Sequence, residues 1–307
     1  MGERPLELSK LTTEQRNSNS MNLDKMTTKK ILQTINDEDK KIAYAVENVL
    51  DLIEVAVNQI YEALNKGGRL FYVGAGTSGR LGVMDASECP PTFMVSKEMV
   101  QTVMAGGEKA FINAAEGVED EESQGFRDLK KRSLTAKDIV IGITASGRTP
   151  YPMGALKYAR EVGAYTISLS SNKNSQISKY ADCKIEIVVG PEVLTGSTRM
   201  KAATSHKMVL NMISTAVMVK LGKVYENLMV DVHASNYKLK ERAKRTVMEV
   251  TDSTYEEAEE VLLAANYKVK PAIIMIELGV SFQEAEEAIK ESNGYVREAI
   301  RLLANQL

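Results

Sequence analysis

Five short apolar runs with helical stretches between them constrain the fold of this chain more than any other feature. The runs span Leu70–Val73, Val100–Met104, Ile139–Ile143, Tyr165–Leu169 and Ile185–Val189. Runs of this length, bounded by turn signals, are typical of strands that are buried on both faces of a sheet. Because helical stretches alternate with them, we predict an α/β fold in which right-handed βαβ units form a doubly wound, mainly five-stranded parallel sheet flanked by helices.

Helical periodicity accounts for much of the chain around this predicted sheet. Apolar side chains recur every three or four residues from Lys40 to Leu64, which predicts one amphipathic helix. Gly125–Arg132 and Met153–Val162 are predicted to be helices that connect strands. Met200–Leu221 is apolar nearly all round after its first turn, so we expect a long helix that is buried in the core or in a subunit interface.

The character of the chain changes at about Thr251, where short amphipathic helices replace the strand–helix alternation. They are predicted over Tyr255–Ala264, Val269–Leu278, Ser281–Ser292 and a stretch that ends at Leu303. Thr254 and Ser281 have the character of helix N-caps. The spacing is weakly similar to ubiquitin-associated three-helix modules, so we expect a small helical bundle that packs or dimerises.

Composition and charge exclude several classes of function. A net charge of -2 gives no general attraction for nucleic acid. No apolar run approaches the length of a membrane-spanning helix, and the polar N-terminal stretch does not have the character of a signal peptide. The two cysteines are too few for a disulfide framework. We therefore expect a soluble, cytoplasmic protein with no nucleic-acid or membrane partner.

The first predicted strand runs into a glycine-rich loop that matches a dinucleotide-binding pattern. Gly74, Gly76 and Gly79 satisfy GxGxxG. That fingerprint also expects an acidic residue about 20 positions further on, at the end of the second strand, to bind the ribose. The second strand here ends at Met104–Gly107 without an Asp or Glu. The pattern therefore does not favour a nicotinamide cofactor.

A phosphate site explains the same loop better. Backbone N–H groups at Gly76 can approach an anion at a helix N-terminus, and Thr77 and Ser78 add hydroxyl donors. A second loop after the third strand repeats this chemistry with Ser146, Gly147 and Thr149. For either loop alone, a tight turn with N-capping hydroxyls explains the sequence equally well. Both loops together, at the carboxyl edge of one sheet, favour a shared phosphate site.

The paired loops resemble the sugar isomerase (SIS) domain, and longer stretches are similar to the N-acetylmuramic acid 6-phosphate etherase family. These stretches are Ile35–Asp39, Asp85–Phe93, Ala105–Glu108, Ala115–Asp120, Gly196–Ala202 and Asn227–Val232. The resemblance covers nearly the whole chain. It implies an N-terminal arm and helix over residues 1–39, an SIS sugar-phosphate-binding domain over 40–225, a connecting helix over 226–250 and a small helical domain over 251–307.

The resemblance also implies an activity. Members of this family convert N-acetylmuramic acid 6-phosphate to N-acetylglucosamine 6-phosphate and D-lactate, without a cofactor, during recycling of cell-wall sugar. Glu88 and Glu119 fall on the catalytic pair, with Glu88 as the acid for lactate departure and Glu119 as the base at C2. We expect burial and mutual repulsion to separate their pKa values. The alternative for each glutamate is a solvated surface position, and the acidic run after Glu116 suits an ordinary helix start.

Further residues at the start of the long helix are candidates for binding the anionic substrate. These are Ser197, Thr198 and Lys201; Arg199 and Lys201 are candidates for the lactyl carboxylate, although first-turn surface cations explain the pattern equally well. His206 is expected to be a satisfied core residue. The two histidines and two cysteines form no metal motif, so we expect no metal site.

Two other functions share these features. An aldose–ketose isomerase would also open the sugar ring and remove the C2 proton, and a phosphosugar-sensing regulator would bind the ligand without catalysis. We expect a homodimer with the phosphosugar site near the interface, because SIS-like domains commonly dimerise in this way.

Overall fold

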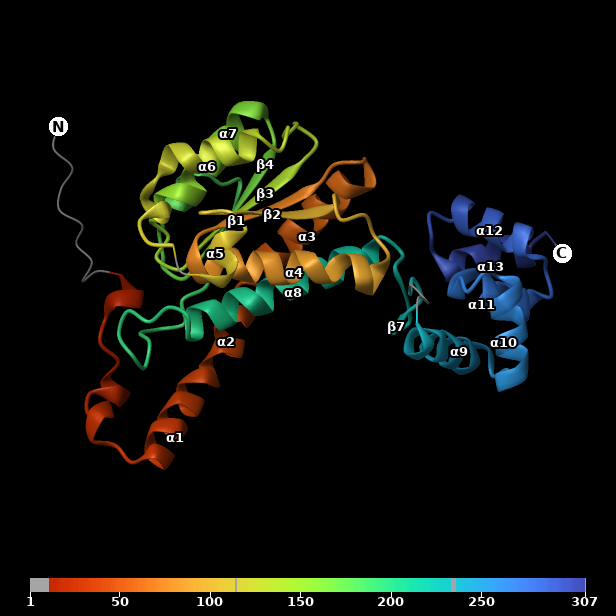
Figure 1. Cartoon of the computed structure of the whole chain (residues 1–307), viewed down its shortest axis with the longest axis horizontal. Helices are drawn as coiled ribbons and strands as arrows, with labels where there is room; N and C mark the ends of the chain where they lie inside the picture. The colour runs from red at the N-terminus through yellow and green to blue at the C-terminus, as the bar shows by residue number, and fades with distance from the viewer. Residues whose placement is uncertain (1–10, 114, 233–235, 307) are drawn as a thin grey trace. The chain divides into compact units, whose positions relative to one another are not determined.

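A computed structural model describes residues 11–113, 115–232 and 236–306 of the chain (Figure 1). The chain forms two compact units. The first holds the chain as far as Ala86 together with Glu98–Ser214, and the second holds Ser87–Lys97 together with the chain from Thr215 onwards. None of the helices in the described part of the chain is both long and apolar enough to cross a lipid bilayer.

A five-stranded parallel sheet forms the centre of the first unit, as predicted. Its strands are β1 (Leu70–Gly74), β2 (Val100–Met104), β3 (Ile139–Thr144), β4 (Tyr165–Ser170) and β5 (Cys183–Glu186). They lie in the order β2-β1-β3-β4-β5, and every neighbouring pair is parallel. Every residue of β1 and β3 is buried, which explains their continuous apolar sequence.

The last strand lies earlier in the chain than predicted. The apolar run Ile185–Val189 indicated its position, but the ladder pairs Cys183–Glu186 with β4. β5 is an edge strand in which Lys184 is exposed between the buried Cys183 and Ile185. Such an alternating strand has no continuous apolar run, so the criterion that located the central strands was wrong here by two to three residues.

Helices lie on both faces of this sheet (Figure 1). The helices from the N-terminal arm to the end of the sheet region are α1 (Thr28–Asp39), α2 (Lys41–Glu47), α3 (Leu50–Asn65), α4 (Gly76–Phe93), α5 (Lys109–Ile112), α6 (Glu122–Lys130), α7 (Pro150–Val162) and α8 (Lys201–Lys220); α1 extends away from the sheet. Helices α6 and α7 lie on one face, above the sheet in Figure 1, and α3 lies on the other. A hydrophobic core cluster joins strand residues such as Phe71 and Val140 to Leu156 of α7. The predicted long helix corresponds to α8.

The single helix predicted from Lys40 to Leu64 is instead divided into α2 and α3, and α1 precedes them. The break falls at Asn48 and Val49, where Val49 has φ -121° and ψ 12°, outside the helical region. The Asn48 side chain donates to the carbonyl of Tyr44 at 2.9 Å. Asparagine competes in this way with backbone hydrogen bonding, and apolar periodicity alone does not reveal it.

Helix α4 includes Pro90 and Pro91 in its last turn and ends at Phe93. Because proline has no backbone N–H, the two prolines remove hydrogen-bond donors from the last turn of the helix only. Met94, just after the helix, has a left-handed φ of 50°. Asp85 fixes α4 against its neighbours, since its carboxylate accepts from Tyr72 Oη at 2.8 Å and from Asn211 Nδ2 of α8 at 2.7 Å. Burial raises the pKa of Asp85 despite these bonds.

The second unit contains the predicted helical bundle. Its elements after α8 are the hairpin β6 (Val224–Tyr225) and β7 (Leu228–Met229), then α9 (Tyr237–Thr251), α10 (Tyr255–Ala264), α11 (Val269–Leu278), α12 (Phe282–Glu291) and α13 (Val296–Ala304). Thr254 accepts from the backbone of Glu257, and Ser281 forms a capping box with Glu284, so both predicted N-caps are confirmed. Buried apolar residues such as Leu262 form a core separate from that of the sheet.

Candidate active site

A pocket of about 220 Å³ lies in the first unit, at the carboxyl ends of β1 and β3. The residues that line it are Glu14, Ala75, Gly76, Thr77, Ser78, Glu119, Ile143, Thr144, Ala145, Ser146, Thr149, Gly196, Thr198, Ala203 and His206. Both predicted phosphate loops therefore meet at one cavity. This is the position at which ligands bind in open α/β sheets.

The first loop depends on glycine because strand and helix approach closely. A Cβ on Gly79 would lie 2.7 Å from the carbonyl oxygen of Gly74, and a Cβ on Gly74 would lie 2.8 Å from the nitrogen of Gly79. This contact brings the first turn of α4 directly to the end of β1. Thr77 and Ser78 are half-buried there, and neither hydroxyl makes a hydrogen bond within the described part of the chain. Two hydroxyls and a helix N-terminus therefore face the pocket with donor capacity to spare.

The second loop is built differently. Thr149 precedes α7, but its side chain does not cap the helix; its hydroxyl lies 2.7 Å from that of Thr144. Ser146 Oγ accepts from the backbone of Arg148 and lies 3.3 Å from Thr144 Oγ1. Gly147 has φ 73° and does not line the pocket; a Cβ there would lie 2.2 Å from Ser175 Oγ. A row of three linked hydroxyls at the pocket wall is not explained by helix capping alone.

The two predicted catalytic glutamates lie in different places. Glu119 is in a 3₁₀ turn, Val118–Asp120, and lines the pocket. Glu88 lies in α4, twelve residues after Gly76, which at 1.5 Å per residue is about 18 Å along the helix axis. Both glutamates are exposed in this single chain.

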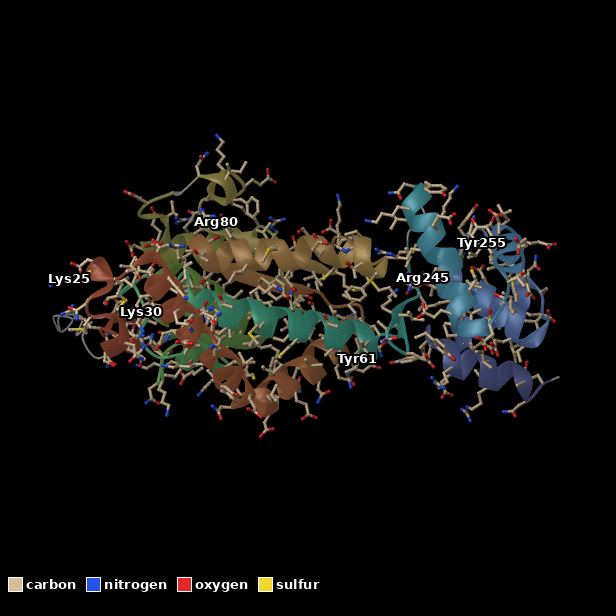
Figure 2. All side chains as sticks on the ribbon, turned by 90° about the horizontal axis from the view of Figure 1, so that it is seen from below. Lys25, Lys30, Tyr61, Arg80, Arg245 and Tyr255 are labelled. Atoms are coloured by element: carbon tan, nitrogen blue, oxygen red, sulfur yellow. The ribbon has the colours of Figure 1, made fainter. Side chains whose placement is uncertain are left out.

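Contacts with α4 help to place the segment that leads to Glu119. The guanidinium of Arg80, labelled in Figure 2, donates to the carbonyls of Ala110 at 2.8 Å and Phe111 at 2.9 Å. The backbone of Ala105, just after β2, donates to the carbonyl of Gly74 at 3.1 Å. The chain between β2 and Glu119 is therefore attached to the same strand end and helix start that form the first loop.

The start of α8 contributes less to the pocket than predicted. Thr198 lines it, whereas Ser197 and Lys201 do not. The Lys201 side chain is 1% exposed, and its Nζ lies 2.6 Å from Glu38 Oε2. Glu192 accepts from the backbone of Lys201 at 3.0 Å. Since its ammonium is already paired, we do not include Lys201 among the substrate contacts that we propose.

His206 lies at the wall of the pocket and is fully buried. Its Nε2 lies 3.0 Å from Ser171 Oγ, whereas its Nδ1 makes no hydrogen bond with any residue that the structure describes. His206 is therefore buried in the core as predicted, and one of its two ring nitrogens is paired. Burial lowers the pKa of His206 to about 4, against a smaller opposite effect of the Ser170 backbone. The imidazole is neutral at pH 7.

Because His206 is buried, we expect the stability of the fold to depend on pH. The unfolded chain binds a proton at His206 as pH falls through about 6.5, and the folded chain does so only near pH 4. Stability from this residue is therefore complete above pH 6.5 and falls toward pH 4, by about 2 kcal/mol between pH 7.5 and 5. Urea unfolding at both pH values should show that decrease in the wild type beyond the one in His206→Asn. Protonation of the ring with an ordinary pKa, observed by NMR, would contradict this expectation.

Glu14 is a pocket residue that the sequence did not indicate. It ends the 3₁₀ turn Thr12–Glu14 in the polar N-terminal arm, which has neither hydrophobic periodicity nor a motif of its own. The arm's position depends on contacts with residues more than 150 positions away. No local pattern could have placed this carboxylate beside Glu119.

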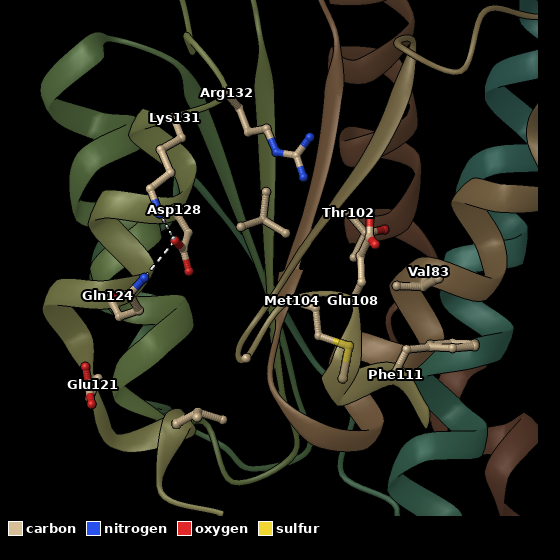
Figure 3. Close-up of a pocket in the computed structure, with 14 residues that line it drawn as sticks. Val83, Thr102, Met104, Glu108, Phe111, Glu121, Gln124, Asp128, Lys131 and Arg132 are labelled. Atoms are coloured by element: carbon tan, nitrogen blue, oxygen red, sulfur yellow. Dashed lines mark hydrogen bonds and ion pairs between the residues drawn. The ribbon is translucent and has the colours of Figure 1, made fainter. Parts of the chain in front are cut away.

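A larger cavity of about 920 Å³ lies along the edge strand β2 (Figure 3). The carboxylate of Asp128 in this cavity already accepts hydrogen bonds from the side chains of Gln124 at 2.7 Å, Lys131 at 3.0 Å and Tyr151 at 3.0 Å. Figure 3 shows Gln124 of α6 and Lys131, just after α6, beside Asp128, with Glu108 and Phe111 across the cavity. The cavity has no pair of hydroxyl loops, so we place the candidate site in the smaller pocket. No group of three or more potential metal ligands occurs in the described ranges of the chain.

Comparisons with known proteins identify the family of the chain. Residues 51–160 match the glucokinase regulatory protein N-terminal SIS domain, and residues 113–216 match the SIS domain. The chain is 57% identical to the N-acetylmuramic acid 6-phosphate etherase of Bacillus subtilis (strain 168) over 296 residues, which covers 96% of this chain and 97% of that protein. The chain belongs to the N-acetylmuramic acid 6-phosphate etherase family. The resemblance predicted from the sequence is confirmed.

A second relative and a solved structure are also similar to the chain. The etherase of Geobacillus sp. (strain WCH70) is also 57% identical, over 294 residues that cover 96% of this chain and all of that protein. A solved phosphoheptose isomerase from Francisella tularensis is 16% identical, with a TM-score of 0.47, and the match covers 62% of this chain and 98% of that chain. The predicted SIS-type α/β fold is confirmed by the family models together with the observed parallel sheet.

Proposed function

We propose that this protein is a carbon–oxygen lyase that cleaves the D-lactyl ether of N-acetylmuramic acid 6-phosphate to give N-acetylglucosamine 6-phosphate and D-lactate. One observation carries the proposal. A chain of this family brings two hydroxyl-bearing loops and the carboxylate of Glu119 to one pocket at the sheet edge. The loops suit a phosphate, and the carboxylate suits removal of a proton from the sugar.

The chemistry needs a base and an acid. Ring opening exposes an aldehyde at C1, which makes the C2 proton acidic. A carboxylate removes that proton, the electron pair forms the C2–C3 double bond, and the C3–O bond breaks while an acid protonates the lactate oxygen. Water then adds at C3 and C2 regains a proton, so one water is consumed overall. Two carboxyl groups in different protonation states suffice, each contributing about 10²- to 10⁴-fold.

The position of each residue supports the role that we propose for it. Thr77, Ser78, Ser146 and Thr149 bind the phosphate, with the N-terminus of α4 oriented toward it. Glu119, at the same pocket, is the base at C2. The acid is Glu88. Within one chain, however, Glu88 lies about 18 Å from Gly76 along the axis of α4, so it is not close to the phosphate site of its own chain.

A homodimer accounts for this separation. We assign the acid to the partner subunit's Glu88, which would complete the pocket and bury both carboxyl groups. Large apolar side chains exposed on α4 and α8 suit such an interface: Met84, Met212 and Val219. Burial at the interface would also provide the low-dielectric surroundings that are needed to separate two carboxyl pKa values.

Mixed dimers test the shared site. Glu88→Ala and Glu119→Gln chains are each expected to be inactive alone. Co-expressed with different tags, they should recover about a quarter of the wild-type rate, because half of randomly assorted dimers are mixed and one of the two sites in each is intact. Chains purified separately and mixed without exchange serve as the control. If the purified mixed dimer has no activity, Glu88 acts within its own chain.

An assay for D-lactate separates the candidate reactions. Incubation with N-acetylmuramic acid 6-phosphate should release D-lactate and N-acetylglucosamine 6-phosphate in equal amounts without added metal or nucleotide. An aldose–ketose isomerase would produce a ketose phosphate and no lactate, and a phosphosugar-sensing regulator would bind without turnover. No lactate from folded protein would exclude the etherase proposal. We place the reaction in the cytoplasm because the chain has only two cysteines, too few for a disulfide framework, which suits a reducing compartment.

A further inference from the structure

Glu14 is a carboxylate in the candidate pocket for which the two-glutamate mechanism has no role. It is half-buried and lines the pocket together with Glu119 and the hydroxyl loops. Its Oε2 lies next to Gly196, where a Cβ would be 3.5 Å away. The Glu14 side chain makes no hydrogen bond or ion pair with any residue that the structure describes. All of its acceptor capacity is therefore available to a ligand.

The arm that carries Glu14 is fixed to the second phosphate loop. The buried side chain of Asn172 donates to Thr13 Oγ1 at 3.2 Å and accepts from the backbone of Thr13 at 3.4 Å. The same Nδ2 lies 3.1 Å from the carbonyl of Ala145 and 3.2 Å from that of Ser146. One amide thus joins the residue before Glu14 to the residue that carries a phosphate-binding hydroxyl.

The arm is also fixed to the segment that leads into α8. Asn17 Nδ2 donates to the carbonyl of Pro191 at 2.9 Å, and Ser20 Oγ donates to that of Val193 at 2.7 Å. Leu11 and Thr13 are buried. Contacts on both sides of Glu14 therefore hold it between two segments that line the pocket, and its place there does not depend on its own side chain.

Charge determines which part of a ligand can meet Glu14. A phosphate dianion would be repelled by this carboxylate and attracted by the hydroxyls and the N-terminus of α4. Hydroxyl and amide N–H groups of a sugar are donors, and a carboxylate is the strongest acceptor for them. The pocket thus has a donor side for phosphate, which includes Thr77 and Ser146, and an acceptor side at Glu14.

We propose that Glu14 is a substrate-binding residue that accepts hydrogen bonds from hydroxyl or amide N–H groups of the phosphosugar and so orients the sugar relative to the phosphate. The inference rests on the proposed function for the identity of the ligand. It adds a third carboxylate to the site, supplied by the N-terminal arm. Glu14 acts on the sugar, and its loss leaves the phosphate subsite intact.

The test compares two ligands on one variant. Glu14→Gln removes the charge and keeps the shape of the side chain. Titration calorimetry should show about 10- to 100-fold weaker binding of N-acetylglucosamine 6-phosphate, the range expected for a hydrogen bond to a charged group, and inorganic phosphate bound as tightly as by wild type. The kcat/KM for lactate release should fall by a similar factor. Glu54→Gln, which neutralises an exposed carboxylate on α3, is the matched control and should match wild type in both assays.

The outcomes separate this inference from the proposed function. Sugar phosphate bound equally by Glu14→Gln and wild type would overturn the role of Glu14. Equal weakening for inorganic phosphate and sugar phosphate, or a lowered melting temperature, would also overturn it, since that result would mean that Glu14 only holds the pocket together. If the wild type binds N-acetylglucosamine 6-phosphate but releases no lactate, the etherase proposal fails and the binding comparison still stands.

Discussion

Glu119→Gln is expected to remove both lactate release and hydrogen exchange at C2, each by about 10²- to 10⁴-fold. Glutamine keeps the volume of the side chain but has no basic oxygen that can take the C2 proton. Both processes begin with that proton transfer, so both should be lost together. Glu119 is exposed in a surface turn, so the substitution should leave the free energy of unfolding unchanged.

Two measurements check this expectation. D-lactate release reports the whole reaction, and incorporation of deuterium from heavy water at C2 reports the first step alone. Glu121→Gln is the matched control, an exposed glutamate two residues further on that does not line the small pocket, and it should be nearly as active as wild type. Exchange that persists in Glu119→Gln while lactate release is lost would reverse the roles, making Glu119 the acid and Glu88 the base.

The fold and the phosphate loops could be predicted because both depend on short-range sequence signals. Fully buried strands such as β1 have continuous apolar runs, and the ends of parallel strands meet at one edge by topology. Thr77 and Ser146, although distant in sequence, could therefore be placed together. The edge strand β5 and the break at Asn48 were misplaced since they depend on exposure and on a side-chain hydrogen bond, which apolar spacing does not encode.

The rest of the site depends on long-range contacts that no local pattern reveals. The arm that carries Glu14 is held at the pocket by a hydrogen bond between Thr13 and Asn172, a residue just after β4. Lys201 has the sequence context of an exposed first-turn cation, yet it is buried against Glu38. A charged residue's partner decides whether it faces solvent, a ligand or the core, and this partner lies 163 positions away. We expect the loss of this Lys201–Glu38 ion pair to have a large effect on stability.

Lys201→Met should destabilise the fold by about 3 kcal/mol, because it leaves the buried carboxylate of Glu38 without its most buried partner. Lys201 and Glu38 side chains are 1% and 4% exposed, and their charged atoms lie 2.6 Å apart. Burial alone would raise the pKa of Glu38, but hydrogen bonds from Lys201, Lys41 and Asn19 lower it to about 2. Folding therefore favours the ionised carboxylate, and without Lys201 the desolvation cost of that charge is poorly compensated.

The variant should also change how stability depends on pH. Because its folded pKa is lowered, Glu38 stabilises the wild type fully above about pH 4.5, and this contribution is lost as pH falls toward 2. In Lys201→Met that acid-dependent loss should be smaller. Urea unfolding measures both effects. Lys41→Met removes the other lysine from the same carboxylate, but its side chain is 54% exposed, so it should cost under about 1 kcal/mol. Equal destabilisation by the two variants would show that the buried Lys201–Glu38 pair stabilises the fold no more than the exposed Lys41–Glu38 pair. A larger loss for Lys201→Met would establish that Glu38 on α1 and the start of α8 are held together by a buried charge.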